Sequence, residues 1–120
     1  MNKHRHTETL NISAQQTISA KVKNYAEIIG VDYRKVRIRK LKSRWGSCNI
    51  IGDLSFNSLL LLTPDNIQDY VIVHELAHRK EMNHSVEFWN IVSSVLPDYK
   101  ASKTWLENEG ALIIQSEFAS

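Results

Sequence analysis

Apolar residues near the N-terminus follow the 3.6-residue period of an amphipathic helix. The predicted helix begins near Ser13, a good N-cap, and ends at Gly30, a good C-cap. Its inward positions are Ile18, Val22, Tyr25, Ala26 and Ile29. Residues 1–12 are polar, so we expect them to form a loose tail ahead of a single domain over residues 13–120.

The spacing then changes to the alternation that is typical of half-buried strands. In "RKVRIRK", Val36 and Ile38 alternate with basic residues. The segments "SRWGSC" and "DLSFNS" follow as two further strands, which the short loop "NIIG" joins as a hairpin. Because Leu41 breaks the alternation, we expect a bulge or bend near Arg39–Lys40.

Helical periodicity returns in "TPDNIQDYVIVHELAHRKEM". Thr63 is the predicted N-cap, Pro64 suits the first helical position, and Asp65 favours the positive end of the helix dipole. The apolar stripe of this helix consists of Ile67, Val71, Ile72 and Leu76.

Two more helices are predicted after it. "NHSVEFWNIVSSVL" has Asn83 or His84 as its cap and ends at Pro97, and its inward residues are Phe88, Trp89, Val92, Val95 and Leu96. "DYKASKTWLENEGALIIQ" follows, with a possible break at Gly110. This order predicts an α+β domain: an N-terminal helix, a three-stranded, mostly antiparallel sheet, and then three helices.

Composition narrows the class of protein. The chain has 120 residues, of which 42% are hydrophobic and 23% charged, as in an ordinary globular domain rather than a disordered one. Its single cysteine, Cys48, excludes an intramolecular disulfide and is predicted to be a small buried hydrophobe. The sequence contains no signal-peptide pattern and no apolar run long enough to span a bilayer, so we expect a cytoplasmic protein without a membrane partner.

Basic residues are concentrated in one short stretch. Residues 34–44 contain seven lysines and arginines and no acid. The stretch is either a solvated strand face or a site for the phosphates of a nucleic acid or a nucleoside triphosphate. It contains no aromatic residue that would stack on bases.

Three of the five histidines lie close together in "VIVHELAHRKEMNH". His74 and His78 are four residues apart, so both rings lie on one helix face, where they can grip one metal ion. Glu75, rotated by about 100° from His74, is placed to reach a water molecule on that ion. This H-E-x-x-H arrangement is typical of zinc peptidases, in which the glutamate takes a proton from the water that attacks a carbonyl.

A catalytic zinc usually has three protein ligands, so a third is required. His84 lies where the chain turns into the next helix and is the predicted third ligand. Glu81, Glu87 and Glu107 are the alternatives.

The motifs "RWGSC", "FN", "HELAHRKEMNHSVEFW" and "PDYK" together resemble the YgjP-like metallopeptidase family, which is related to the WLM and SprT-type zinc proteases. The resemblance covers roughly Val36 to Leu106. It implies a minimal zincin fold with one Zn²⁺ per chain. At matching positions it implies His74, His78 and His84 as zinc ligands and Glu75 as the general base. A nucleotide pyrophosphatase activity on UTP has also been assigned to a member.

Five further residues are candidates for substrate binding: Arg44, Trp45, Gly46, Asn57 and Tyr99. Gly46 would let a peptide backbone come close, and Trp45 is either a pocket wall or part of the core. Asn57 is either a carbonyl-polarising group or a strand cap. Arg44 and Tyr99 are the candidates for stabilising an oxyanion.

Three hypotheses of function follow. The first is a zinc metallopeptidase acting on peptides or proteins. The second is a metal-dependent pyrophosphatase of UTP-like nucleotides, whose phosphates the basic stretch would hold. The third is a zinc-stabilised binding module without catalysis, in which Cys48 would close the metal site.

Overall fold

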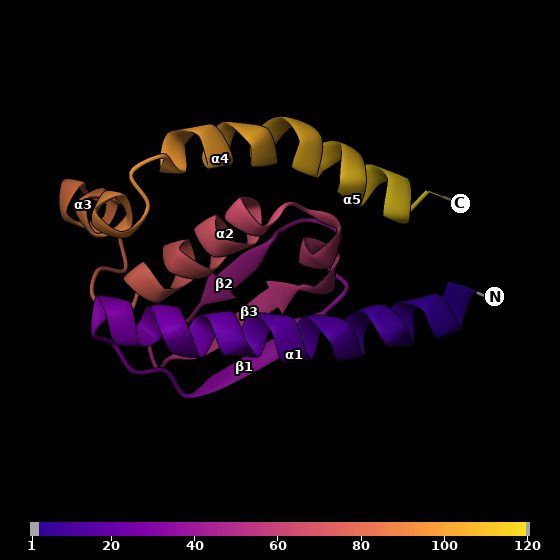
Figure 1. The fold of residues 1–120 in the computed structure, drawn as a ribbon, viewed down its shortest axis with the longest axis horizontal. Helices are drawn as coiled ribbons and strands as arrows, with labels where there is room; N and C mark the ends of the chain where they lie inside the picture. The colour runs from indigo at the N-terminus through magenta and orange to yellow at the C-terminus, as the bar shows by residue number, and fades with distance from the viewer. Residues whose placement is uncertain (1–2, 120) are drawn as a thin grey trace.

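The computed structural model describes the backbone of residues 3–119. Figure 1 shows a small sheet, a long helix α1 packed along it, and a second helical layer over α2. The elements are α1 (Lys3–Ile29), β1 (Lys35–Arg39), β2 (Gly46–Cys48), β3 (Asp53–Asn57), the 3₁₀ helix η1 (Ser58–Leu62), α2 (Asp65–Ala77), α3 (Val86–Val95), α4 (Tyr99–Trp105), the π-helix η2 (Leu106–Gly110) and α5 (Ala111–Glu117). In this described part, no helix is both long and apolar enough to cross a membrane.

The sheet has the order β1-β3-β2, and the predicted α+β class is confirmed. The sheet is mixed rather than mostly antiparallel, because β1 pairs with β3 in parallel and only β2 and β3 are antiparallel. Instead of bulging near Arg39–Lys40, β1 ends at Arg39, and the chain crosses the end of β3 before it enters β2. The Asn57 side chain holds this crossover: its amide nitrogen donates to the carbonyls of Leu41 (2.7 Å) and Arg44 (2.9 Å).

Helix α1 begins earlier than its apolar pattern predicts. The predicted N-cap, Ser13, lies inside the helix, and residues 3–12 continue it toward the N-terminus. The stretch before Gly30 contains no glycine or proline, so nothing in the local sequence stops the helix at residue 13. The predicted stripe packs as expected: Ile18 and Val22 are fully buried, and Gly30 follows the last helical turn at a φ of 82°.

Helix α2 lies at the centre of the molecule, between the sheet and the helices α3 and α4. Its predicted stripe is buried, and Tyr70 and Val73 are buried on other sides of it. Pro64 rather than Thr63 occupies the N-cap position, because the Thr63 hydroxyl ends η1 by donating to the Leu60 carbonyl at 2.6 Å. The central position of α2 leaves two of its polar residues, Gln68 and Glu75, buried.

The C-terminal helices form one curved rod over α2 (Figure 1). Gly110, predicted as a possible break, lies in helical conformation at the end of the π-turn. A Cβ at this position would come within 3.1 Å of the Trp45 indole nitrogen, so the glycine lets the rod rest on Trp45. The helical backbone therefore continues through Gly110, where a break was predicted, and the glycine contacts Trp45.

Candidate metal centre and active site

The three histidines are held by the end of α2 and the turn that follows it. His74 lies in the last turns of α2, and His78 is its C-cap residue. The chain then reverses, and Ser85 begins α3 by accepting a hydrogen bond from the Phe88 amide at 3.3 Å. Ser85 is therefore the cap, where Asn83 or His84 was predicted. Since the cap is supplied by Ser85, the His84 ring is available to face back toward α2.

The three imidazoles converge on one point. One ring nitrogen from each of His74, His78 and His84 lies within 4.8 Å of the others. The Nε2 atoms of His74 and His84 are 3.2 Å apart. Tetrahedral zinc with bonds of roughly 2.0–2.1 Å holds its ligand atoms about 3.3 Å apart. The spacing and chemistry of these donors therefore fit a single zinc-like cation.

Hydrogen bonds to the other ring nitrogens fix two of the rings. His78 Nδ1 lies 3.0 Å from the Glu81 carbonyl oxygen, and His74 Nδ1 lies 2.9 Å from Glu75 Oε2. Both oxygens accept, so each Nδ1 carries the hydrogen and leaves Nε2 with a free lone pair. Both His74 and His78 are thus set in the tautomer that a metal requires.

Aromatic rings close one side of the cluster. The fully buried Phe88 ring has its centroid 4.5 Å from that of His78 and 4.9 Å from that of His84. The centroid of the Trp89 ring is 5.9 Å from that of His84, and the two ring planes are inclined by 29°. Partial burial, together with the neighbouring His74 and His78, lowers the pKa of His84 from its usual value. Both effects favour the neutral ring, which is the form that binds a metal.

Glu75 is buried between the histidines and strand β2. Its side chain is 8% exposed, and a Cβ at Gly46 would come within 3.1 Å of its Cγ atom. The same Cβ would meet Val71 and Phe56 at 3.2 and 3.3 Å. Gly46 therefore provides the space in which the glutamate lies. Gly46 was predicted to let a substrate backbone come close. In the structure, the absence of a side chain at Gly46 makes room for Glu75.

A small crevice opens beside His74 and Glu75. Its volume is about 190 Å³, and its walls are Trp45, Gly46, Tyr70, Val71, His74, Glu75 and Leu106. Trp45 forms a wall and also packs against the core. Leu106 belongs to the π-turn, so the C-terminal rod supplies the wall opposite the sheet. The crevice is mostly apolar and has its polar groups at the histidine end.

Tyr70 is the polar residue of this crevice that the sequence analysis did not consider for the site, and the apolar walls Val71 and Leu106 were not considered for it either. It lies four residues before His74 on α2, and that spacing is the signal that would have found it. The two ring centroids are 5.9 Å apart. Burial, and then the charges of Glu107 and Glu75, raise the pKa of Tyr70 to about 12. Its hydroxyl therefore keeps its proton at neutral pH.

The other predicted site residues lie outside the crevice. The Arg44 side chain is exposed in the crossover before β2, and the Asn57 amide is engaged by that same crossover. Tyr99 stacks on Trp89 at 5.2 Å. Of the alternative metal ligands, Glu81 contributes its backbone carbonyl to His78, and neither Glu87 nor Glu107 joins the histidine cluster of the described residues.

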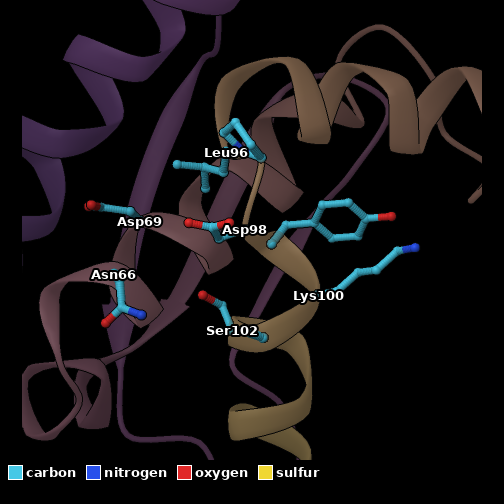
Figure 2. Close-up of a pocket in the computed structure, with 9 residues that line it drawn as sticks. Asn66, Asp69, Leu96, Asp98, Lys100 and Ser102 are labelled. Carbon is cyan, nitrogen blue, oxygen red and sulfur yellow. The ribbon is translucent and has the colours of Figure 1, made fainter.

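A larger cavity than the crevice lies apart from the histidines (Figure 2). It has a volume of about 580 Å³ and lies between α2 and the start of α4. Asp69 reaches its edge but is paired with Lys21 at 2.9 Å. Tyr99 lines this cavity rather than the crevice beside Glu75.

Cys48 packs against the core from β2, and its thiol donates to the Asn49 carbonyl at 3.3 Å. Burial first, and then the charge of Glu75, raise its pKa from 9.0 to about 11.

Because of this raised pKa, we expect alkylation of Cys48 by iodoacetamide at pH 8 to be about 100-fold slower than in a cysteine peptide, since only the thiolate reacts. Mass spectrometry of the time course measures this, with the urea-unfolded chain as control. Equal rates in the folded and unfolded chains would contradict it.

Comparison with known proteins places this chain in a family. A family model described as "YgjP-like, metallopeptidase domain" matches residues 2–109. No curated protein matches the chain. Among solved structures, the metallopeptidase zymogen abylysin of Pyrococcus abyssi is similar, with a TM-score of 0.67 and 25% identity over 77% of this chain and 95% of that chain. The zymogen jannalysin of Methanocaldococcus jannaschii has the same fold, with a TM-score of 0.65 and 20% identity over 79% and 96% of the two chains. The chain thus belongs to the YgjP-like metallopeptidase family.

Proposed function

We propose that the protein is a zinc-dependent peptidase whose metal is held by His74, His78 and His84, with one ion per chain. The observation that carries the proposal is the convergence of three ring nitrogens within 4.8 Å, with Glu75 buried beside them at the end of a crevice. Three nitrogen ligands suit zinc better than magnesium, which prefers oxygen. They also leave a fourth position open for the reaction.

Glu75 is the general base in this mechanism. A bound zinc supplies Lewis acidity, which makes water nucleophilic at neutral pH. The Glu75 carboxylate lies against His74, where it accepts the proton of the attacking water. The same carboxyl group then donates that proton to the leaving amine. Its burial keeps bulk water away from the transferred proton.

Strand β2 is the proposed guide for the substrate. It lies at an edge of the sheet, and its Gly46 borders the crevice. An extended peptide that adds to this edge would bring a carbonyl past Glu75. The apolar walls Trp45, Val71 and Leu106 would accept a medium-sized apolar side chain of that peptide. Tyr70 lines the crevice and is the proposed residue for stabilising the oxyanion, in place of Arg44 and Tyr99, which do not line it.

The other two hypotheses have weaker support. For a nucleoside triphosphate hydrolase, the basic residues would have to face the metal site. Lys35 and Arg37 instead alternate with residues that pack toward the helices, so they project from the far face of the sheet. For a closed structural site, Cys48 would have to join the histidines, yet the metal-ligand cluster found among the described residues consists of the three histidines.

Metal removal tests the proposed function. We expect the purified protein to cleave a fluorescent casein, to lose this activity after dialysis against a chelator, and to regain it with one equivalent of Zn²⁺. UTP incubated in parallel should remain intact. Chelator-sensitive hydrolysis of UTP without casein cleavage would contradict the proposal and favour the pyrophosphatase. Zinc retention without either activity would favour the binding module.

A further inference from the structure

Strand β1 carries its charges on one side only. Val36 and Ile38 are half-buried and pack against the core, whereas Lys35, Arg37 and Arg39 are exposed. Because side chains alternate along a strand, the three cations project from the face of the sheet opposite the helices. Their positions span about 13 Å, at roughly 3.3 Å per residue. They form a straight ladder of charge rather than a cluster around one point.

The rest of this face is polar, and the acidic residue Asp53 lies beside Lys35 at one end of it. Ser55 lies beside Arg37 in the register, and Ser47 lies beside Ser55 on the next strand. Both α1 and α2 pack on the opposite face, where Leu54 and Phe56 are fully buried. Serine side chains are small, so at these two positions an extended ligand can lie across the strands. The serine hydroxyls add hydrogen-bond donors to the ladder.

Five of the seven basic residues in 34–44 are not engaged within the described chain. Arg34 pairs with Asp53 at 3.1 Å, and Lys40 contacts Glu117 at 3.9 Å. No acidic partner from the described residues contacts the other five, which are Lys35, Arg37, Arg39, Lys42 and Arg44. Lys42 and Arg44 lie in the crossover that the Asn57 amide fixes to the end of the sheet. The five cations, which have no acidic partner among the described residues, therefore lie along edge strand β1 and the crossover that follows it.

We propose that this surface, the basic sheet face made of Lys35, Arg37, Arg39, Lys42 and Arg44, docks the phosphate backbone of a nucleic acid. A repeating polyanion matches a ladder of cations, and arginine and lysine contacts to phosphate need no particular base sequence. A free triphosphate would require cations that converge, which a ladder of about 13 Å does not provide. A membrane surface is disfavoured, because the apolar residues of β1 point into the protein and leave this face nothing to insert into lipid.

The docking surface and the metal centre are separate. The sheet lies between the basic face and α2, which carries His74 and His78. Docking would therefore leave the crevice beside Glu75 open, and it would hold the peptidase on a nucleic acid without occupying its active site. This inference goes beyond the proposed peptidase function and does not depend on it.

Fluorescence anisotropy with labelled 20-base-pair DNA and RNA duplexes tests the inference on the full chain. With three to five phosphate contacts, raising the salt from 50 to 200 mM should weaken binding roughly 40- to 500-fold. The triple variant Lys35→Gln, Arg37→Gln, Arg39→Gln should bind at least about 30-fold more weakly at 50 mM salt, with a salt slope smaller by about 3. The charge-retaining variant Arg37→Lys, Arg39→Lys should bind like wild type.

A matched control removes the same charge elsewhere. The variant Lys23→Gln, Lys80→Gln, Lys100→Gln changes three exposed lysines on other surfaces and should bind within about twofold of wild type. Thermal melts establish that each variant is folded. Equal losses in the two triple variants would overturn the proposal, because binding would then reflect net charge alone. Unchanged binding in the β1 variant would also overturn the proposal. The charges would then serve to prevent edge strand β1 from pairing with a strand of another chain. Equal binding to anionic lipid vesicles would overturn the assignment to nucleic acid.

Discussion

Replacement of Glu75 by glutamine is expected to lower kcat for peptide hydrolysis by about 100- to 10,000-fold while the zinc content stays at one ion per chain. Glutamine has nearly the same shape, so it can occupy the space beside Gly46, and it can still accept a hydrogen bond from His74 through its amide oxygen. It cannot take up a proton at neutral pH. Elemental analysis and casein cleavage, measured on the same preparation, separate the two effects.

Glu87→Gln is the matched control for this prediction. Glu87 is exposed in the first turn of α3, close in sequence to His84. The change removes the same charge without touching the crevice, so activity should stay within about twofold of wild type. If Glu75→Gln cleaved casein as fast as wild type, Glu75 would not be the base, even if zinc were essential.

The His84→Ala variant is expected to bind zinc at least about 100-fold more weakly than wild type, since a direct ligand is lost. At saturating zinc, a 100-fold weaker affinity removes about 2.7 kcal/mol of the stabilisation that the metal gives to the folded state. The fold itself should persist, because His84 is exposed and Ser85 rather than His84 caps α3. Competition with a chromophoric chelator gives the affinity, and urea melts with and without zinc give the stabilisation.

Asn83→Ala provides the comparison, because the residue is exposed in the same turn and holds no place in the histidine cluster. Its zinc affinity should be close to that of wild type. Wild-type affinity in the His84→Ala variant would show that the third ligand is another residue, and Glu81 would then be the next to test.

The parts of the fold that the sequence predicted are those in which periodicity and burial agree. The stripe that includes Val71 and Leu76 identified α2 as a core helix, and the alternation of Val36 and Ile38 identified β1. The mixed sheet was not predictable in this way. A pairing partner depends on where the chain crosses, and the Asn57 side chain decides that by holding the Leu41–Arg44 segment across the end of β3.

The histidine cluster was more predictable than the crevice. The spacing of His74 and His78 fixes their common face through helix geometry alone, and His84 required only that the chain turn back. The crevice walls come from β2, α2 and η2, which are far apart in sequence. Leu106 has no local pattern that relates it to Glu75. The contact of Gly110 with Trp45, the residue before β2, is likewise visible only in three dimensions.

The close contact between Glu75 and Gly46 limits which residues can be accepted at position 46. Even an alanine at position 46 would place a methyl group 3.1 Å from the glutamate, so the carboxylate would have to shift by a few tenths of an ångström. Catalytic rates are sensitive to displacements on that scale. Substitutions at position 46 should therefore be accepted only alongside compensating changes at Val71 or Phe56, the other two side chains that surround it. A residue in a short edge strand is therefore expected to vary together with residues of helix α2 and strand β3.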